Sequence, residues 1–265
     1  MTIGATAAFY AQAGRTNLAA PKRNAITDAE RAIAATPGLL FWLDADHMPM
    51  NGNPYLRDRA GGHAIGRQSY DATTTRDLND MNGKAVLKFT TDIHGLKSPS
   101  VTIPTTSFSL VAVMRLRETG VATIVGDTGG SSGSRVNFAM NTDANLRFDF
   151  ATAGGTNVVS SGVDSMATDG SEAAVVWASY SSVDSTAAVG KNGNALSTEN
   201  FTITHKGSVG LQIGSQTTAA TDDDNSGAMD LAALLVIGSA GHGTDIAGVA
   251  GMATAVAALR TLYGI

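Results

Sequence analysis

Acidic residues next to apolar runs are the side chains in this sequence best suited to chemistry. Hydrolysis of a glycosidic bond needs one carboxyl group as proton donor and a second as nucleophile or base across the bond. Asp44 and Asp46 come closest to such a pair, but they end the apolar run 39–43 and precede a polar stretch. The glutamates stand far apart, at Glu30, Glu118, Glu172 and Glu199. We therefore predict that the protein is not an enzyme, and glycoside hydrolysis is the least favoured of the functions that we consider.

A run of acids at Asp222, Asp223 and Asp224, followed by Asn225, offers the oxygen ligands that calcium prefers. Adjacent carboxylates also repel each other and often form a hydrated loop without a metal, which is the interpretation we favour. The five histidines are scattered and lack the spacing of a zinc site. We predict no cofactor, with calcium at Asp222–Asp224 as the alternative.

Two further patterns bear on catalysis and on sugar binding. Residues 129–133, GGSSG, match the GxSxG pattern of hydrolase nucleophiles, but that motif requires a following helix and here a strand pattern follows. Trp42 and Trp177 lie within apolar runs and are predicted to be core residues. Tyr55 and Tyr70 lie in the polar stretch 47–82 and are our candidates for an exposed aromatic contact with a sugar.

The first residues of the chain are basic and lack a clear periodicity. Arg15, Lys22 and Arg23 carry the charge of this segment, and the first acid is Asp28. Thr27 and Glu30 then have the spacing of a capping box, which starts a helix that Pro37 and Gly38 must end. We predict two parts: an N-terminal arm with a short helix at residues 1–36, and a β-sandwich at residues 37–265. A disordered tail is the alternative for the arm.

The rest of the chain has the pattern of an all-β protein. The run 229–238, MDLAALLVIG, is typical of a strand buried on both faces, and we place it at the centre of the core. Residues 108–116 alternate between apolar and other side chains, as expected for a strand. Residues 135–140 and 145–150 predict a hairpin, and Asn192-Gly193 predicts another. We also expect strands at 101–103 and 201–204, and long loops with one short strand pair at 47–82.

The C-terminal end predicts a single amphipathic helix. Val249, Met252, Val256, Leu259 and Tyr263 recur at steps of three and four residues, with Thr244 as the candidate N-cap and Gly264 as the end. The apolar stripe of this helix is expected to pack across a sheet or the sandwich edge.

Composition limits the functional classes. The chain has 265 residues, a formal net charge of −5 and no cysteine, which excludes a disulfide framework and argues against nucleic-acid binding. The longest apolar run is far shorter than the ~20 residues of a membrane helix. The N-terminus lacks the pattern of a signal peptide, so we expect synthesis in a cytoplasm without export.

The order of these pieces resembles the concanavalin A-like lectin/glucanase jelly roll, in its laminin-G-like branch. The resemblance covers roughly residues 39–265 and lies in spacing and strand character, in the segments FWLD (41–44), AVLKF (85–89), SFSLVAVM (107–114), NLRF (145–148), VGKNG (189–193), LQIG (211–214) and GAMDL (227–231). A C-terminal helix of this kind resembles the tail of many bacterial and phage versions. The resemblance implies two antiparallel sheets packed face to face.

These observations favour a non-enzymatic virion structural protein, such as a capsid decoration or tail-surface component. The arm, with Arg15, Lys22 and Arg23, would bind other virion proteins in an assembly in which we expect the chain to be a homo-oligomer. The first alternative is a lectin-like module that binds a host glycan through Tyr55 and Tyr70. We expect neither nucleic acid nor a membrane as a partner.

Overall fold

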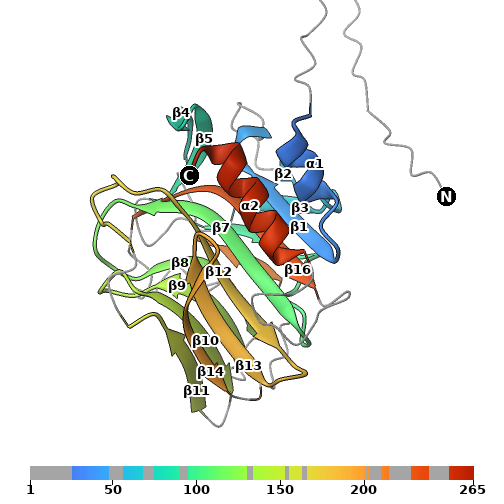
Figure 1. The fold of residues 1–265 in the computed structure, drawn as a ribbon, viewed down its shortest axis with the longest axis vertical. Helices are drawn as coiled ribbons and strands as arrows, with labels where there is room; N and C mark the ends of the chain where they lie inside the picture. Colours follow the sequence, from blue (N-terminus) through green and yellow to red (C-terminus); the bar gives the residue numbers. More distant parts are fainter. Residues whose placement is uncertain are drawn as a thin grey trace, which may run out of the picture.

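The computed structural model describes residues 26–47, 56–67, 75–89, 95–129, 134–152, 155–162, 166–200, 202, 210–214, 228–238 and 251–265. Two antiparallel sheets of eight strands each pack face to face, and two helices lie outside one of them (Figure 1). The predicted all-β sandwich with a C-terminal helix is confirmed.

The first sheet has the strand order β14-β13-β12-β7-β16-β5-β4, and β1 also pairs with β16. Its members are β1 (Leu39–Asp44), β4 (Thr75–Met81), β5 (Lys84–Phe89), β7 (Phe108–Leu116), β12 (Ala174–Ser181), β13 (Thr186–Lys191), β14 (Asn194–Asn200) and β16 (Met229–Gly238).

The second sheet has the strand order β11-β10-β9-β8-β15-β6-β3-β2. Its members are β2 (Leu56–Arg57), β3 (Ala64–Arg67), β6 (Leu96–Ser98), β8 (Ala122–Gly129), β9 (Ser134–Met140), β10 (Leu146–Thr152), β11 (Gly155–Ser160) and β15 (Leu211–Ile213). A 3-10 turn, η1 (Ala45–His47), follows β1.

The strand β16 is buried along its whole length and contributes to two apolar layers. A bulge between Leu231 and Ala233 shifts the register against β7. Leu231, Leu234 and Val236 therefore face the core between the sheets, whereas Leu235 and Ile237 face the helices. Burial on both faces explains why this stretch has no polar alternation.

The two helices form the second apolar layer over the outer face of the first sheet (Figure 1). In α1 (Asp28–Ala34), the predicted capping box is present: the Thr27 hydroxyl accepts from the Glu30 N–H, and the Glu30 carboxylate accepts from the Thr27 N–H. The buried Ile33 joins α1 to α2 (Met252–Tyr263). The part of residues 1–36 that the structure describes thus packs against the sandwich, and residues 1–25 lie outside the described residues.

The helix α2 presents the predicted stripe to the sheet and ends at Gly264. Met252, Val256, Leu259 and Tyr263 are buried. The helix begins later than the predicted cap, with Gly251 at the N-cap in a left-handed conformation (φ 95°). Thr244 and Val249 lie outside the described residues. A Cβ at Gly251 would meet Pro37 at 2.7 Å, so the start of α2 approaches the end of the α1 segment too closely for a larger residue.

Both predicted hairpins are confirmed, and the strand predicted at 101–103 is wrong. Residues 101–103 are not a strand, although Val101 and Ile103 are buried; the Ile103 N–H bonds to the Asp127 carboxylate instead of a strand partner. The nearest preceding strand is β6, which ends at Ser98. Most of the strand predicted at 201–204 lies outside the described residues, and β14 (Asn194–Asn200), the second strand of the Asn192-Gly193 hairpin, precedes it. The stretch 47–82 contains β2 paired with β3, as predicted, and also β4.

Candidate functional site

The outward face of the hairpin β9–β10 carries four polar side chains. On β9, Val136 and Phe138 point into the core, so Arg135 and Asn137 point outward; on β10, Arg147 and Asp149 do the same. The register places Asp149 opposite Asn137 and Ala151 opposite Arg135. Because diagonal neighbours on one face of a sheet lie within reach of long side chains, Asp149 lies between two arginines.

The carboxylate of Asp149 is held by its neighbour on the same strand. The Arg147 Nε donates to Asp149 Oδ1 at 2.6 Å. Asp149 is only 3% exposed although it lies on an outward face. Burial raises the pKa of Asp149 above its ordinary value, and the hydrogen bond and charge of Arg147, with the charge of Arg135, offset this only in part.

These side chains line a cavity of about 250 Å³, which we call the face cavity. Its remaining lining residues are Val121, Ala139, Met140 and Asn141. The small side chain of Ala139, opposite Arg147, leaves room between the polar groups. The Asn141 Oδ1 accepts from the N–H groups of Asp143 and Asn145, which fixes the turn at one end of the cavity. The face cavity is polar, positively charged and placed on a fully paired hairpin.

A wider cavity of about 600 Å³ lies at the ends of the strands, lined by Thr119, Thr142, Asp143, Ala144, Met166, Ala167, Thr168, Glu172 and Lys191. Its two longest charged side chains are joined to each other, with Lys191 Nζ 2.8 Å from Glu172 Oε1. The second Glu172 oxygen accepts the Ala167 N–H. Since these groups already have partners within the loop, we regard the face cavity as the stronger candidate site.

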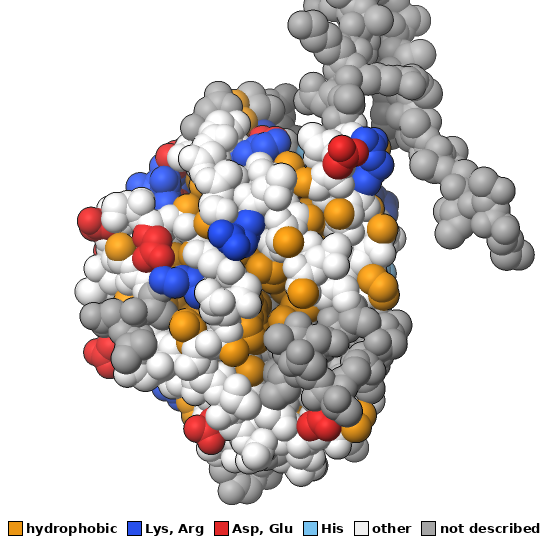
Figure 2. All heavy atoms as spheres, in the orientation of Figure 1, with side chains coloured by type: hydrophobic (Ala, Val, Ile, Leu, Met, Phe, Trp, Pro, Cys, Tyr) orange, Lys and Arg blue, Asp and Glu red, His pale blue; other side chains and the backbone are white. Residues whose placement is uncertain are grey.

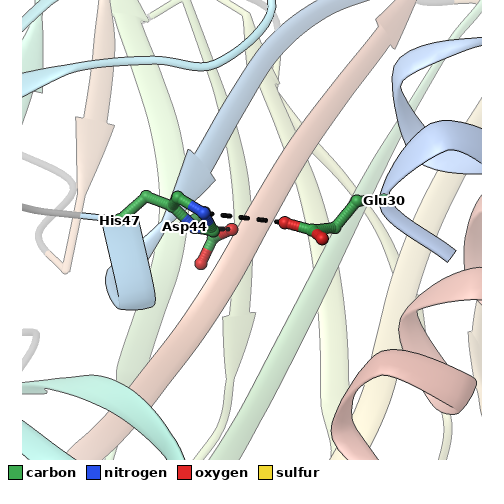
Figure 3. Close-up of side chains that lie close together, drawn as sticks. All are labelled: Glu30, Asp44 and His47. Carbon is green, nitrogen blue, oxygen red and sulfur yellow. Dashed lines mark hydrogen bonds and ion pairs between the residues drawn. The ribbon is translucent and has the colours of Figure 1, made fainter. Parts of the chain in front are cut away.

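A second polar cluster joins α1 to the end of β1, and Figure 3 shows three of its members, Glu30, Asp44 and His47. Their ligand atoms lie within 4.8 Å of one another, which is close enough for a metal ion. The Arg59 Nη1, however, lies 2.9 Å from Glu30 Oε1 and 2.5 Å from Asp44 Oδ2. The guanidinium also stacks over Trp42, with its carbon 3.9 Å from the ring centroid. Arg59 therefore supplies the positive charge at this cluster, which we call the Arg59 clamp.

The carboxyl groups of the Arg59 clamp favour their charged forms. Burial alone would raise the pKa of Asp44, but hydrogen bonds and charge from His47 and Arg59 outweigh it and lower the pKa. Burial opposes ionisation of Glu30 as well, and hydrogen bonds from Thr27 and Arg59 again leave its pKa lowered. Burial and the nearby Asp44 and Asp46 raise the pKa of Tyr263 well above its ordinary value, and its hydroxyl donates to the Ala232 carbonyl at 3.1 Å.

A third charged group, on the outer face of β16, is structural. Asp230 is fully buried and accepts from Arg115 Nε at 2.5 Å and Arg117 Nε at 2.7 Å. Asp80 on β4 pairs with the same two arginines. Each charge in this group is matched by neighbours on adjacent strands.

The site residues predicted from sequence all lie outside the described residues: Tyr55, Tyr70, Arg15, Lys22, Arg23, Asp222, Asp223 and Asp224. Their roles stay predictions. Asp44, the strand-end acid considered for catalysis, lies in the Arg59 clamp, whereas Asp46 accepts from the Ala85 N–H and pairs with Lys84 at 3.2 Å. The face cavity was missed; the signal for it was the outward pair Arg147 and Asp149 in a predicted hairpin.

Comparison with solved structures establishes the fold. The chain superposes on Trypanosoma rangeli sialidase in complex with sialic acid with a TM-score of 0.57 and 13% identity, over 88% of this chain and 37% of that one. For the botulinum neurotoxin serotype D ligand binding domain in complex with N-acetylneuraminic acid, the TM-score is 0.57 and the identity 9%, over 87% and 53% of the chains. For the botulinum neurotoxin type G receptor binding domain, the TM-score is 0.56 and the identity 11%, over 85% of this chain and 51% of that one.

These likenesses show that the chain has the concanavalin A-like lectin/glucanase fold, as the sequence predicted. The chain spans about half or less of the length of these solved proteins. No protein-family model matches the sequence, and no curated protein is significantly similar to it. Within the described residues, no helix has the length and apolar character needed to cross a membrane.

Proposed function

We propose that the protein is a non-enzymatic, lectin-like module that binds a glycan through the face cavity. The observation that carries this proposal is the face cavity itself, where Arg135, Asn137, Arg147 and Asp149 converge on the outward face of a rigid sheet. Sugars are recognised by side chains that donate to and accept from hydroxyl groups, and this lining offers both kinds.

Two further points support the proposal. Solved proteins of the same fold include one in complex with sialic acid and one in complex with N-acetylneuraminic acid, so similar sandwiches occur in sugar-binding proteins. None of the described residues that line the face cavity is an aromatic on which a sugar could stack. We therefore expect binding through hydrogen bonds, with weak affinity for a single copy and a gain when several copies are joined.

The test is a glycan array probed with the full-length chain joined into tetramers through a biotin tag. We expect binding to a subset of glycans that Asn137→Ala and Arg147→Ala each reduce at least about tenfold, since each removes a hydrogen-bonding group from the lining of the face cavity. Arg57→Ala is the matched control, because Arg57 is exposed and, among the described residues, its guanidinium hydrogen-bonds only to the loop carbonyl of Gly62. The absence of any bound glycan, or equal loss in the control, would contradict the proposal.

A structural role in a virion is the second candidate, and the Arg59 clamp favours it. The clamp ties α1 to the sandwich through Glu30 and Arg59, so a partner that bound residues 1–25 would be held at a fixed point on the domain. Under this proposal the basic residues Arg15, Lys22 and Arg23 bind other virion proteins while the face cavity remains open, so the two functions are compatible. A chain lacking residues 1–25 that still entered particles normally would contradict it.

A further inference from the structure

The charge of the face cavity is positive. Among its described lining residues, Arg135, Arg147 and Asp149 are the ionisable ones, and the others are Val121, Asn137, Ala139, Met140 and Asn141. With Asp149 ionised, the two guanidinium groups leave a net charge of about +1. Protonation of Asp149 would only raise it. A positive site in a chain whose formal net charge is −5 is a local feature, and it favours an anionic ligand.

Hydrogen-bond donors in the face cavity exceed the acceptors around them. The Arg135 Nε is buried and has no hydrogen-bond partner, and no hydrogen bond or ion pair joins the rest of its guanidinium to a described residue. Arg147 donates through its Nε to Asp149, and no described residue accepts a hydrogen bond from its two terminal nitrogens. A buried donor without a partner destabilises the protein, and a ligand oxygen that accepts a hydrogen bond from this donor would remove that cost. Guanidinium groups match the planar geometry of a carboxylate, to which they donate two parallel hydrogen bonds.

The face cavity also offers an acceptor beside these donors. Of the two Asp149 oxygens, Oδ1 accepts from Arg147, whereas Oδ2 has no hydrogen-bond donor among the described residues and can accept from a ligand hydroxyl group. A ligand that suits the site therefore carries a carboxylate and a nearby hydroxyl group on one small frame. A volume of about 250 Å³ lies at or below the lower end of the range for small-molecule sites, so it favours a single sugar ring over an oligosaccharide.

We propose that the face cavity binds a sugar that bears a carboxylate, with the carboxylate on Arg135 and Arg147 and a ring or side-chain hydroxyl on Asp149. This inference rests on the proposed glycan-binding function and names its ligand class. Sialic acids and uronic acids share the required chemistry. In either case Arg135 is the residue that separates acidic from neutral sugars, because it alone of the three charged side chains forms no hydrogen bond or ion pair with a described residue.

The decisive experiment compares acids with their methyl esters on the unmodified full-length chain. Binding of the methyl α-glycoside of N-acetylneuraminic acid, of methyl glucuronide, of the methyl ester of each and of methyl galactoside is measured by ligand-observed NMR titration. We expect one acid to bind at least about tenfold more tightly than its own ester, because esterification removes the charge-assisted hydrogen bonds. Whichever acid does so identifies the source of the carboxylate.

Two variants locate the effect. Arg135→Gln should remove the preference for the acid over its ester while retaining whatever affinity the ester has. Lys97→Gln removes a positive charge from β6 of the same sheet, outside the lining of the face cavity, and should leave the preference within about twofold. Circular dichroism of both variants checks that they are folded.

The outcomes separate this inference from the proposed function. If a neutral sugar or an ester binds as tightly as the acids, the module binds glycans but the carboxylate assignment is wrong. If none of these sugars binds and the glycan array is also silent, both proposals fail. If the acid preference survives in Arg135→Gln, the carboxylate is recognised elsewhere and the face cavity is not its site.

Discussion

Arg59 is the residue on which the clamp between α1 and β1 depends. It neutralises two carboxylates that the fold has nearly removed from water, Glu30 and Asp44, and it covers one face of Trp42. Removing one partner of a buried ion pair leaves the other charge uncompensated, which is more costly than never having the pair. We expect Arg59→Ala to lower the free energy of unfolding by about 3 kcal/mol, measured by urea denaturation near neutral pH.

Arg57→Ala is the matched control for this prediction, since Arg57 lies two residues earlier, is exposed and donates to a loop carbonyl. Its effect should stay within about 0.5 kcal/mol. Equal effects for the two variants would mean that the clamp contributes no more than a surface arginine.

The clamp also predicts a loss of stability in acid. The folded-state pKa values of Glu30 and Asp44 are lowered, so below about pH 5 the unfolded chain binds more protons at these groups than the folded chain. Their contribution is full above the ordinary carboxyl pKa values and is lost as the pH falls through the folded-state values. Urea midpoints measured between about pH 6 and about pH 3 should therefore fall with pH, and less steeply in Glu30→Gln.

Asp149 has the opposite effect on the pH dependence of stability, because burial raises its pKa. Its contribution is greatest below its ordinary pKa and declines as the pH rises through the folded-state value. Asp149→Asn should accordingly steepen the acid-induced loss relative to the wild type. An unchanged slope in both variants would show that other carboxyl groups control the acid transition.

At the scale of elements, strands whose side chains are buried on one or both faces were predictable. The strands β16 and β7 could be predicted from the sequence because burial selects continuous or alternating apolar residues. The strands β4 (TRDLNDM) and β14 (NALSTEN) lie at the edges of their sheet, so little selects apolar residues in them. The segment 101–103 was wrongly predicted to be a strand, because its apolar side chains are buried although the segment is not part of a sheet.

The candidate site was less predictable than the elements that carry it. The outward positions of Arg147 and Asp149 followed from the alternation of β10. Their place beside Arg135 depends on the register between β9 and β10, which a local pattern does not fix. The Arg59 clamp joins residues 29 positions apart, Glu30 and Arg59, and only the packing of α1 on the sheet brings them together.

The packing of α2 on the first sheet predicts a large loss of stability when Leu259 is truncated. This side chain is fully buried between α2 and the outer face of the first sheet. Leu259→Ala should lower the free energy of unfolding by about 3 kcal/mol, because it removes apolar contacts and leaves a cavity. Thr254→Ala, on the exposed side of the same helix, should change stability by less than about 0.5 kcal/mol in the same urea titration. A similar small effect at Leu259 would mean that α2 is only loosely attached.

At the scale of the whole molecule, the described end of the predicted arm, residues 26–36, belongs to the folded domain. Its helix α1 contributes Ile33 to the helix layer and Glu30 to the Arg59 clamp. The reference for this prediction is a chain lacking residues 1–25, which keeps both of these contacts. A chain lacking residues 1–36 should lose at least about 3 kcal/mol, since it loses both a buried isoleucine and the partner of Arg59. Equal stability of the two truncated chains would contradict this prediction.

The two apolar layers share the first sheet, and this sharing predicts how the molecule unfolds. Strand β16 contributes alternate side chains to the core between the sheets and to the layer beneath the helices, so neither layer can separate without exposing the other. The two tryptophans of the chain, Trp42 and Trp177, both lie in the helix layer, whereas the strands dominate the far-ultraviolet circular dichroism. Tryptophan fluorescence and circular dichroism should therefore give coincident urea transitions. A fluorescence transition at lower urea would mean that the helices detach first and that the sandwich is stable without them.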